Sequence, residues 1–211
     1  NLMTIFNRRF SLSDQTLLKG TFWLQKFGQT IASFTDSSYS QIDEQQIEQN
    51  LTFGTRFILR KELGENTLLI AFNGLITEHE QRNRTFSNLN TFIAVPELEF
   101  GQNIFSLSGE YETQVLENII IKMGAGVDWM TATKTGNKPS IPDFVEYNAT
   151  FGAIYHRAEW SLRAGFAHKT RLPTLRELFG TSLSRFLINP DLQPESNLLG
   201  EIAFGWENEG I

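Results

Sequence analysis

Apolar and polar residues alternate regularly along residues 118–130. One set of alternate positions carries large apolar side chains from Ile119 to Trp129, and the other carries small or charged residues such as Lys122 and Asp128. A period of two residues is typical of a β-strand, because successive side chains of a strand point to opposite faces of the sheet. The pattern therefore predicts a strand with one apolar face and one polar face.

The same alternation recurs along the rest of the chain. It is clear in residues 51–60, 105–112, 145–156, 160–169 and 198–206, and weaker in residues 1–10, 15–34 and 67–80. Together with the first segment, these stretches predict about nine strands and an all-β fold.

The connections between these segments alternate between short and long. The short ones are residues 11–14, 61–66, 114–118 and 156–159, and the long, polar ones are residues 35–44, 81–90, 131–143 and 170–196. In an antiparallel up-and-down meander, this order places the tight turns at one end and the long loops at the other. Residues 90–113 must then form one long strand despite Pro96, which a strand interior tolerates poorly unless a bulge or a separate strand in the loop region intervenes.

Composition removes several classes of protein. The chain has 211 residues, of which 40% are hydrophobic and 20% charged, as in folded proteins. The absence of cysteine excludes disulfides and thiolate metal sites. A net charge of -6 argues against nucleic acid as a partner. No apolar run reaches the length of about 18 residues that a transmembrane helix needs, whereas the strands of a membrane barrel need no such run.

Two architectures fit the alternation. One is a larger transmembrane β-barrel of the outer membrane, and the other is a soluble β-sandwich or lipocalin-like barrel. Aromatic residues near strand ends match the girdles of a membrane barrel, namely Trp129, Trp160, Trp206, Tyr147 and Tyr155. The polar face would suit either a wet lumen or the solvent side of a sandwich, so periodicity alone leaves both open.

Two stretches near the C-terminal end carry linked motifs. They are LRAGFAHKTRLPTLRELFG (residues 162–180) and INPDLQPESNLLGEIAFGWEN (residues 188–208). Their order and spacing resemble the late barrel region of TonB-dependent outer-membrane receptors, in which a "PTLxELF" segment precedes a large external loop and an "NPxLxPE" segment. The matching residues are Pro173, Thr174, Leu175, Glu177, Leu178 and Phe179, then Asn189, Pro190, Leu192, Pro194 and Glu195, then Glu201 and Gly205. Residues 108–129 also resemble the strand, turn and strand that come before these motifs in the family.

The resemblance implies a fold, a location and a class of activity. Family members form a 22-stranded barrel around an N-terminal plug domain, so residues 1–211 would be a partial barrel that lacks the plug and the remaining strands. The resemblance also implies transport across the bacterial outer membrane rather than catalysis. The cargo would be a ferric siderophore or another scarce nutrient, TonB would act through the plug, and lipid would surround the wall. The alternatives are a passive porin-like barrel and a soluble all-β ligand-binding module.

A cluster of basic residues precedes and enters the long connection. It consists of His168, Lys169, Arg171, Arg176 and Arg185. Guanidinium groups match the geometry of carboxylate and catecholate oxygens, so these residues could help to bind an anionic ferric chelate in an external loop. The competing interpretation, which we prefer, is that they pair with loop acids or with lipopolysaccharide phosphates.

The proline motif has a structural interpretation. Pro190 and Pro194 restrict the backbone where the loop rejoins the wall, and we expect Asp191 and Glu195 to form local hydrogen bonds or ion pairs. Pro173, Asn189 and Leu192 belong to the same structural set. The chain contains no phosphate-binding or nucleophile motif. His79, His156 and His168 are isolated in sequence, so no cofactor or metal site is expected.

Overall fold

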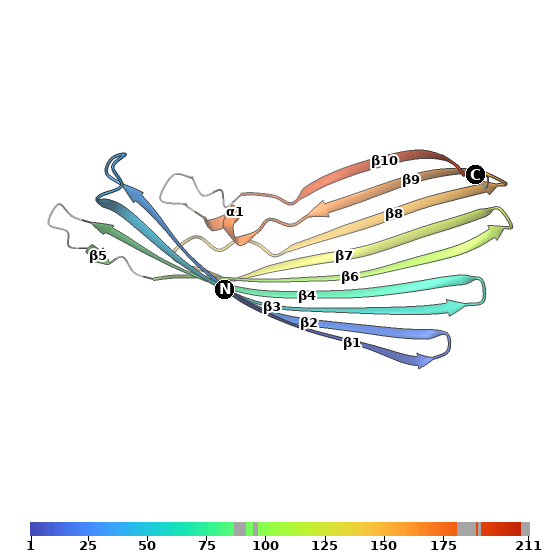
Figure 1. The fold of residues 1–211 in the computed structure, drawn as a ribbon, viewed down its shortest axis with the longest axis horizontal. Coiled ribbons are helices and arrows are strands. Elements are labelled where there is room, and N and C mark those ends of the chain that lie inside the picture. Colours follow the sequence, from blue (N-terminus) through green and yellow to red (C-terminus); the bar gives the residue numbers. More distant parts are fainter. Residues whose placement is uncertain (87–91, 95–96, 181–188, 190, 208–211) are drawn as a thin grey trace.

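The computed structural model forms one antiparallel sheet and describes residues 1–86, 92–94, 97–180, 189 and 191–207 (Figure 1). The strands are β1 (Leu2–Ser13), β2 (Thr16–Phe34), β3 (Ile42–Leu63), β4 (Asn66–Phe86), β5 (Phe92–Ala94), β6 (Leu98–Leu116), β7 (Ile119–Thr135), β8 (Phe144–Arg157), β9 (Trp160–Arg171) and β10 (Glu195–Trp206), and α1 (Leu175–Phe179) is a short helix. The sheet order is β1-β2-β3-β4-β6-β7-β8-β9-β10, and β5 pairs with β4. The predicted all-β meander is therefore confirmed.

Four tight turns lie together at one end of the sheet. They join β1 to β2, β3 to β4, β6 to β7 and β8 to β9, on the right of Figure 1. Gly64, in the β3–β4 turn, has φ of +68°, a conformation that the shortest hairpin turns require and that glycine adopts without strain. We call this the short-turn end and the opposite one the long-loop end. The long connections between β2 and β3, β7 and β8, and β9 and β10 lie at the long-loop end.

The long strand predicted for residues 90–113 is interrupted. β5 and β6 both pair with β4, but Ala94 is opposite Arg84 whereas Leu98 is opposite Gln81. The chain thus advances four residues from Ala94 to Leu98 while β4 advances three. An offset of one residue is what a β-bulge introduces. Pro96 lies within this interval and outside the described residues.

The two faces of the sheet differ in polarity. We call the face covered by α1 the inner face and the other the outer face. The register places Leu107 beside Val127, and Tyr147 next to Val127 on β8, all on the outer face. Ser106, Asp128 and their neighbours lie on the inner face. In the part of the chain that the structure describes, no second layer covers the outer face, where Leu107 is 46% and Phe151 52% exposed.

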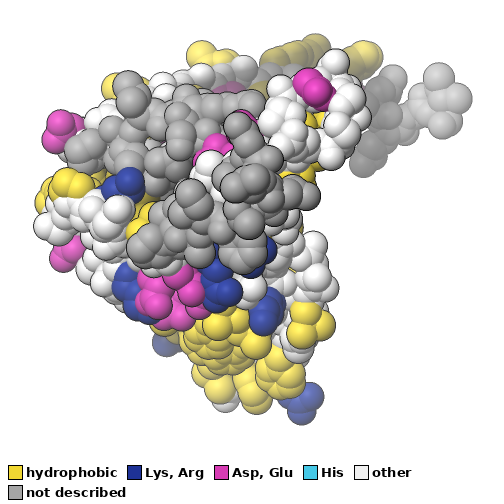
Figure 2. Space-filling view, turned by 90° about the vertical axis from the view of Figure 1, so that its left-hand side faces the viewer, with side chains coloured by type: hydrophobic (Ala, Val, Ile, Leu, Met, Phe, Trp, Pro, Cys, Tyr) yellow, Lys and Arg dark blue, Asp and Glu magenta, His cyan; other side chains and the backbone are white. Residues whose placement is uncertain are grey.

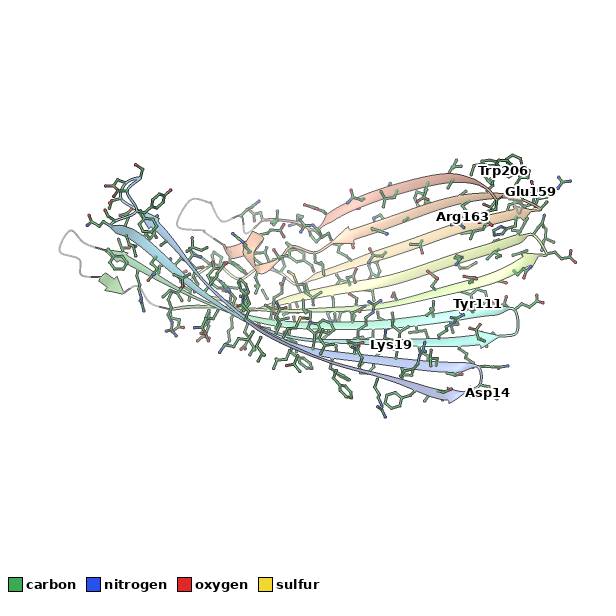
Figure 3. All side chains as sticks on the ribbon, viewed as in Figure 1. Asp14, Lys19, Tyr111, Glu159, Arg163 and Trp206 are labelled. Carbon is green, nitrogen blue, oxygen red and sulfur yellow. The ribbon has the colours of Figure 1, made fainter. Side chains whose placement is uncertain are left out.

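Aromatic side chains mark two levels on the outer face. At the short-turn end, the Trp160 ring lies 4.8 Å from Phe204 and 5.8 Å from Trp206. Trp206 Nε1 donates a hydrogen bond of 3.1 Å to Glu159 Oε2, and Figure 3 shows these two residues together at that end. Tyr147 lies nearer the long-loop end of β8 than Tyr155. Their separation, about 27 Å of strand, becomes about 20 Å after a tilt of about 40°, close to the apolar band of about 25 Å of an outer-membrane barrel.

Several strands continue well beyond this band. β3 has 22 residues and β4 has 21, whereas about 9–11 residues suffice to cross a bilayer. The extra length lies at the long-loop end, where α1 packs. This extended region holds the candidate site.

Candidate functional site

α1 begins at a capping box in the first motif. The Thr174 hydroxyl accepts from the Glu177 backbone N–H at 3.4 Å, and the Glu177 carboxylate accepts from the Thr174 N–H at 2.8 Å. These two bonds satisfy donors that a helix start otherwise leaves unpaired. Pro173 precedes the cap, and the Gly180 N–H donates to Arg176 O at 2.9 Å to close the helix. The sequence PTLRELFG therefore encodes one short, well-defined helical turn.

The apolar side of α1 packs on the inner face of the sheet. Leu178 is 0% and Phe179 2% exposed, and the Phe179 ring stacks on Phe100 at 5.6 Å. The cluster of buried hydrophobic side chains in the described residues consists of Phe100, Met130, Phe144, Leu175, Leu178 and Phe179. Burial of these side chains provides the main free energy that holds α1 in place.

A buried polar contact fixes the segment just before α1. Gln102, which is 5% exposed, donates from Nε2 to Pro173 O at 2.9 Å, and the same amide contacts Met130 Sδ. A buried carbonyl without a partner would be costly. This bond therefore fixes the position of Pro173, just before α1, over β6.

Ion pairs attach the other side of α1 to the strand ends. Arg171, the last residue of β9, contacts Glu177 of α1 at 2.8 Å and Glu195, the first residue of β10, at 3.0 Å. The guanidinium hydrogen bonds and the Thr174 N–H lower the pKa of Glu177 to about 2. Viewed from the long-loop end, basic and acidic side chains lie next to one another beside exposed hydrophobic side chains (Figure 2).

α1 and the inner face of β2, β3, β4 and β6 enclose a cavity of about 490 Å³. We call this the α1 cavity. Five of its polar lining residues carry side-chain amides, namely Gln25, Gln29, Asn50, Gln81 and Gln102. Its aromatic lining is contributed by Phe27, Phe100 and Phe179.

Two residues of opposite charge line the α1 cavity. Glu48, on β3, accepts hydrogen bonds from the side-chain amides of Gln29 and Gln46. Arg176 projects from α1. His79, on β4, is hydrogen-bonded through Nδ1 to Asn50 Oδ1, and both charged groups are near enough to act on its ring electrostatically.

The structure does not gather the predicted basic cluster into one site. His168 lies on the outer face, where it is hydrogen-bonded to Ser196 at 2.9 Å, and alternation directs Lys169 to the inner face. Arg171 is held by two carboxylates, and Arg176 lines the α1 cavity. Arg185 lies outside the described residues.

The proline motif lies where the loop returns to the wall. Asn189 accepts from Asp191 N at 3.2 Å and from Leu192 N at 3.3 Å, and Leu192 packs against the core under α1. Pro194 leads directly into β10, and Pro190 lies outside the described residues. Glu195 forms the ion pair with Arg171. The motif and α1 therefore meet around one small core.

A second depression lies on the inner face, nearer the short-turn end than the α1 cavity. It has a volume of about 550 Å³ and a floor that includes Gly124 and Gly126, with Glu110 and Asp128 among its polar residues. Among the described residues, no group of His, Asp and Glu side chains has the arrangement of a metal site. No described helix is long and apolar enough to cross a membrane.

Sequence reasoning missed the contribution of β2, β3 and β4 to the α1 cavity. Gln29, Glu48 and His79 are far from the proline motif in sequence, and only strand pairing brings them together. One signal was present: residues 42–50 (IDEQQIEQN) are rich in amides and acids on both faces. Such a strand cannot lie in lipid, so it extends beyond the bilayer.

These features define a class of protein. A single-layer antiparallel sheet with an apolar outer face, a polar inner face, short turns at one end and long loops at the other is part of an outer-membrane β-barrel wall. Residues 3–210 match the family described as "TonB dependent receptor-like, beta-barrel". The chain belongs to that family, and the bacterial outer membrane is its location.

Known structures agree on the fold. The copper transporter OprC superimposes with a TM-score of 0.77 at 15% identity, over 98% of this chain and 36% of that one. The ferric-catecholate import receptor Fiu from K12 E. coli, in a closed form, gives a TM-score of 0.57 at 11% identity, over 97% of this chain and 38% of that one. The chain thus spans little more than a third of these relatives. Among curated proteins, no sequence match was found.

Proposed function

We propose that this chain is the part of a TonB-dependent receptor that forms one side of the lumen and an external loop region above the bilayer. The remaining strands would close the barrel, and a plug domain would carry the energy of TonB to the cargo. The cargo would be a ferric siderophore or another scarce metal-containing nutrient. Both similar structures are of proteins named for metal cargo, copper in one and a ferric catecholate in the other.

The observation that carries this proposal is the position of α1. A segment of the β9–β10 connection folds onto the inner face and encloses a cavity at the long-loop end. An unobstructed pore would have no need of a loop anchored there by a buried core and by the ion pair between Arg171 and Glu177. A cavity of this size, with aromatic and amide walls, is in the range of small-molecule sites.

Uptake by the full-length receptor tests the proposal. Cells that carry the receptor as their sole importer would be given radioactive iron as ferric chelates, with TonB present or deleted. We expect uptake that requires TonB. Uptake that persists without TonB would instead support a passive porin-like barrel.

A pair of loop replacements connects the uptake to the cavity. Replacement of residues 174–180 by a glycine-serine linker should abolish most uptake, because it removes one wall of the α1 cavity. The same replacement of residues 35–41, a connection at the same end that does not line the cavity, should leave uptake near the wild-type level. Equal losses in both variants would show that the cavity has no special role.

A further inference from the structure

The α1 cavity has no excess of positive charge. Of the ionised side chains of Asp, Glu, Lys and Arg, the described lining contains one of each sign, Glu48 and Arg176. A multiply charged anion would therefore meet a carboxylate at short range as well as a guanidinium. Close approach of like charges in a partly desolvated site is unfavourable.

The ion-pair cluster on the other side of α1 gives no excess of positive charge either. Arg171 is bound by the carboxylates of Glu177 and Glu195, so two negative charges accompany its one positive charge. The residue type that would favour an anionic chelate is present, but its charge is already compensated. The charges of the cavity lining and of this ion-pair cluster thus both disfavour a highly anionic ligand.

The neutral polar groups of the cavity are held in fixed positions. Gln81 is 3% exposed and donates to Asn83 Oδ1 at 3.1 Å, and Gln102 is fixed by its bond to Pro173 O at 2.9 Å. Thr52 and Thr77 hydroxyls face each other across β3 and β4 at 3.5 Å. Amides and hydroxyls both donate and accept, so they match ligand carbonyls and hydroxyls without requiring charge.

Aromatic rings complete the lining. The stacked pair Phe100 and Phe179, together with Phe27 of β2, offers apolar surface in the same lining as the amides. Fixed polar groups beside an apolar wall are typical of a site for a neutral organic ligand.

We propose that the α1 cavity binds an uncharged part of the cargo that is rich in carbonyl and hydroxyl oxygens, and that it discriminates against multiply charged anions. This inference rests on the proposed function, because it assigns a class of cargo to the same site. Glu48 is the discriminating residue, and Gln81 contributes to neutral recognition.

Binding of two matched chelates to the purified full-length receptor tests this inference. One is a ferric tris-hydroxamate without net charge, and the other is a ferric tris-catecholate with three negative charges. We expect the wild type to bind the neutral chelate at least about tenfold more tightly by calorimetry, since about 1.4 kcal/mol of repulsion suffices for that factor. Equal or tighter binding of the anionic chelate would overturn the inference.

Three variants locate the effect. Glu48→Gln should tighten binding of the anionic chelate about tenfold and change the neutral chelate little, whereas Gln81→Leu should weaken the neutral chelate about tenfold. Glu110→Gln, which removes a carboxylate from the second depression on the same inner face, is the matched control and should change neither. A Glu110→Gln effect as large as that of Glu48→Gln would overturn the assignment to the α1 cavity.

Failure of this inference can be separated from failure of the proposed function. TonB-dependent uptake of the anionic chelate in preference to the neutral one, or of a third cargo without binding of the neutral chelate, would overturn the cavity inference and leave the receptor function standing. Absence of any TonB-dependent uptake would overturn both. Each variant is first checked for the heat-dependent gel mobility of a closed barrel, so that a folding defect is not scored as a binding defect.

Discussion

The short-turn end and the long-loop end use the same strands, but their side chains find partners in different ways. At the short-turn end large apolar side chains such as Phe204, 64% exposed, point outward, and no described part of the chain forms a layer over them. At the long-loop end the chain buries its own side chains, and Met130 and Leu178 are both 0% exposed. The first region therefore depends on lipid, and the second on packing within the protein.

This difference shows how one sheet performs two tasks. A lipid-facing wall needs only alternation, since the hydrocarbon of the bilayer covers every apolar side chain on the outer face that lies between its two surfaces. A binding cavity needs side chains held in fixed positions, and a helix with its own small core provides them. Four substitutions or conditions test the distinction, in order of decreasing effect.

The largest effect is expected from Leu178→Ala. This side chain is fully buried under α1, and removal of a buried leucine typically costs about 2–5 kcal/mol. We expect this loss of free energy to destabilise the docking of α1 on the sheet, so the backbone amides of α1 should exchange their hydrogens faster in the full-length receptor. Leu116→Ala, at a position that is 58% exposed at the short-turn end, is the control and should leave α1 protected. Unchanged exchange in Leu178→Ala would contradict the packing described above.

Phe151→Arg tests the lipid-facing wall, because Phe151 lies on the outer face of β8 halfway between Tyr147 and Tyr155 and is 52% exposed. An arginine on the lipid face near mid-membrane costs about 2–4 kcal/mol of unfolding free energy. The adjacent Thr150→Arg points to the inner face and should cost far less. Unfolding of the intact barrel in lipid vesicles compares the two. Equal losses would mean that the outer face does not contact lipid.

Thr174→Ala removes the N-cap of α1. Loss of the hydroxyl acceptor should destabilise α1 docking by about 1 kcal/mol. Thr174→Ser keeps an oxygen at the same position and should retain most of the docking free energy. Limited proteolysis of the β9–β10 connection provides the measurement, and identical cleavage rates for both variants would argue against the capping box.

The smallest effect concerns pH. The pKa of Glu177 is lowered from 4.5 to about 2 by Arg171 and the Thr174 N–H. A depressed carboxyl pKa stabilises the docked state above pH 4.5, and this contribution is lost as the pH falls toward 2. Because the pair is partly exposed, we expect less than about 1 kcal/mol. The rate of α1 hydrogen exchange, corrected for intrinsic pH dependence, should rise across this window, and Glu177→Gln should remove the change.

The sequence by itself determined the strands at the short-turn end. The alternation in residues 119–129 and 145–155 corresponds to strands in the structure. One face of each strand meets lipid and the other meets water, so apolar and polar residues must alternate with a period of two. The alternation of short and long connections likewise determined which end would carry the loops. Pro96 marked the place where the strand pairing is offset.

For the parts of the strands that extend beyond the bilayer, the alternation no longer predicts the structure. Residues 42–50 are polar on both faces, so no period predicts a strand, yet β3 begins at Ile42 because its backbone groups pair with both neighbouring strands. The motif PTLRELF predicts a structural element but not its docking place. Gln102 and Pro173 are 71 residues apart in sequence, and only the folded sheet brings them within 2.9 Å. Local pattern thus determined the wall, whereas the cavity was decided by contacts between distant strands, which no local pattern encodes.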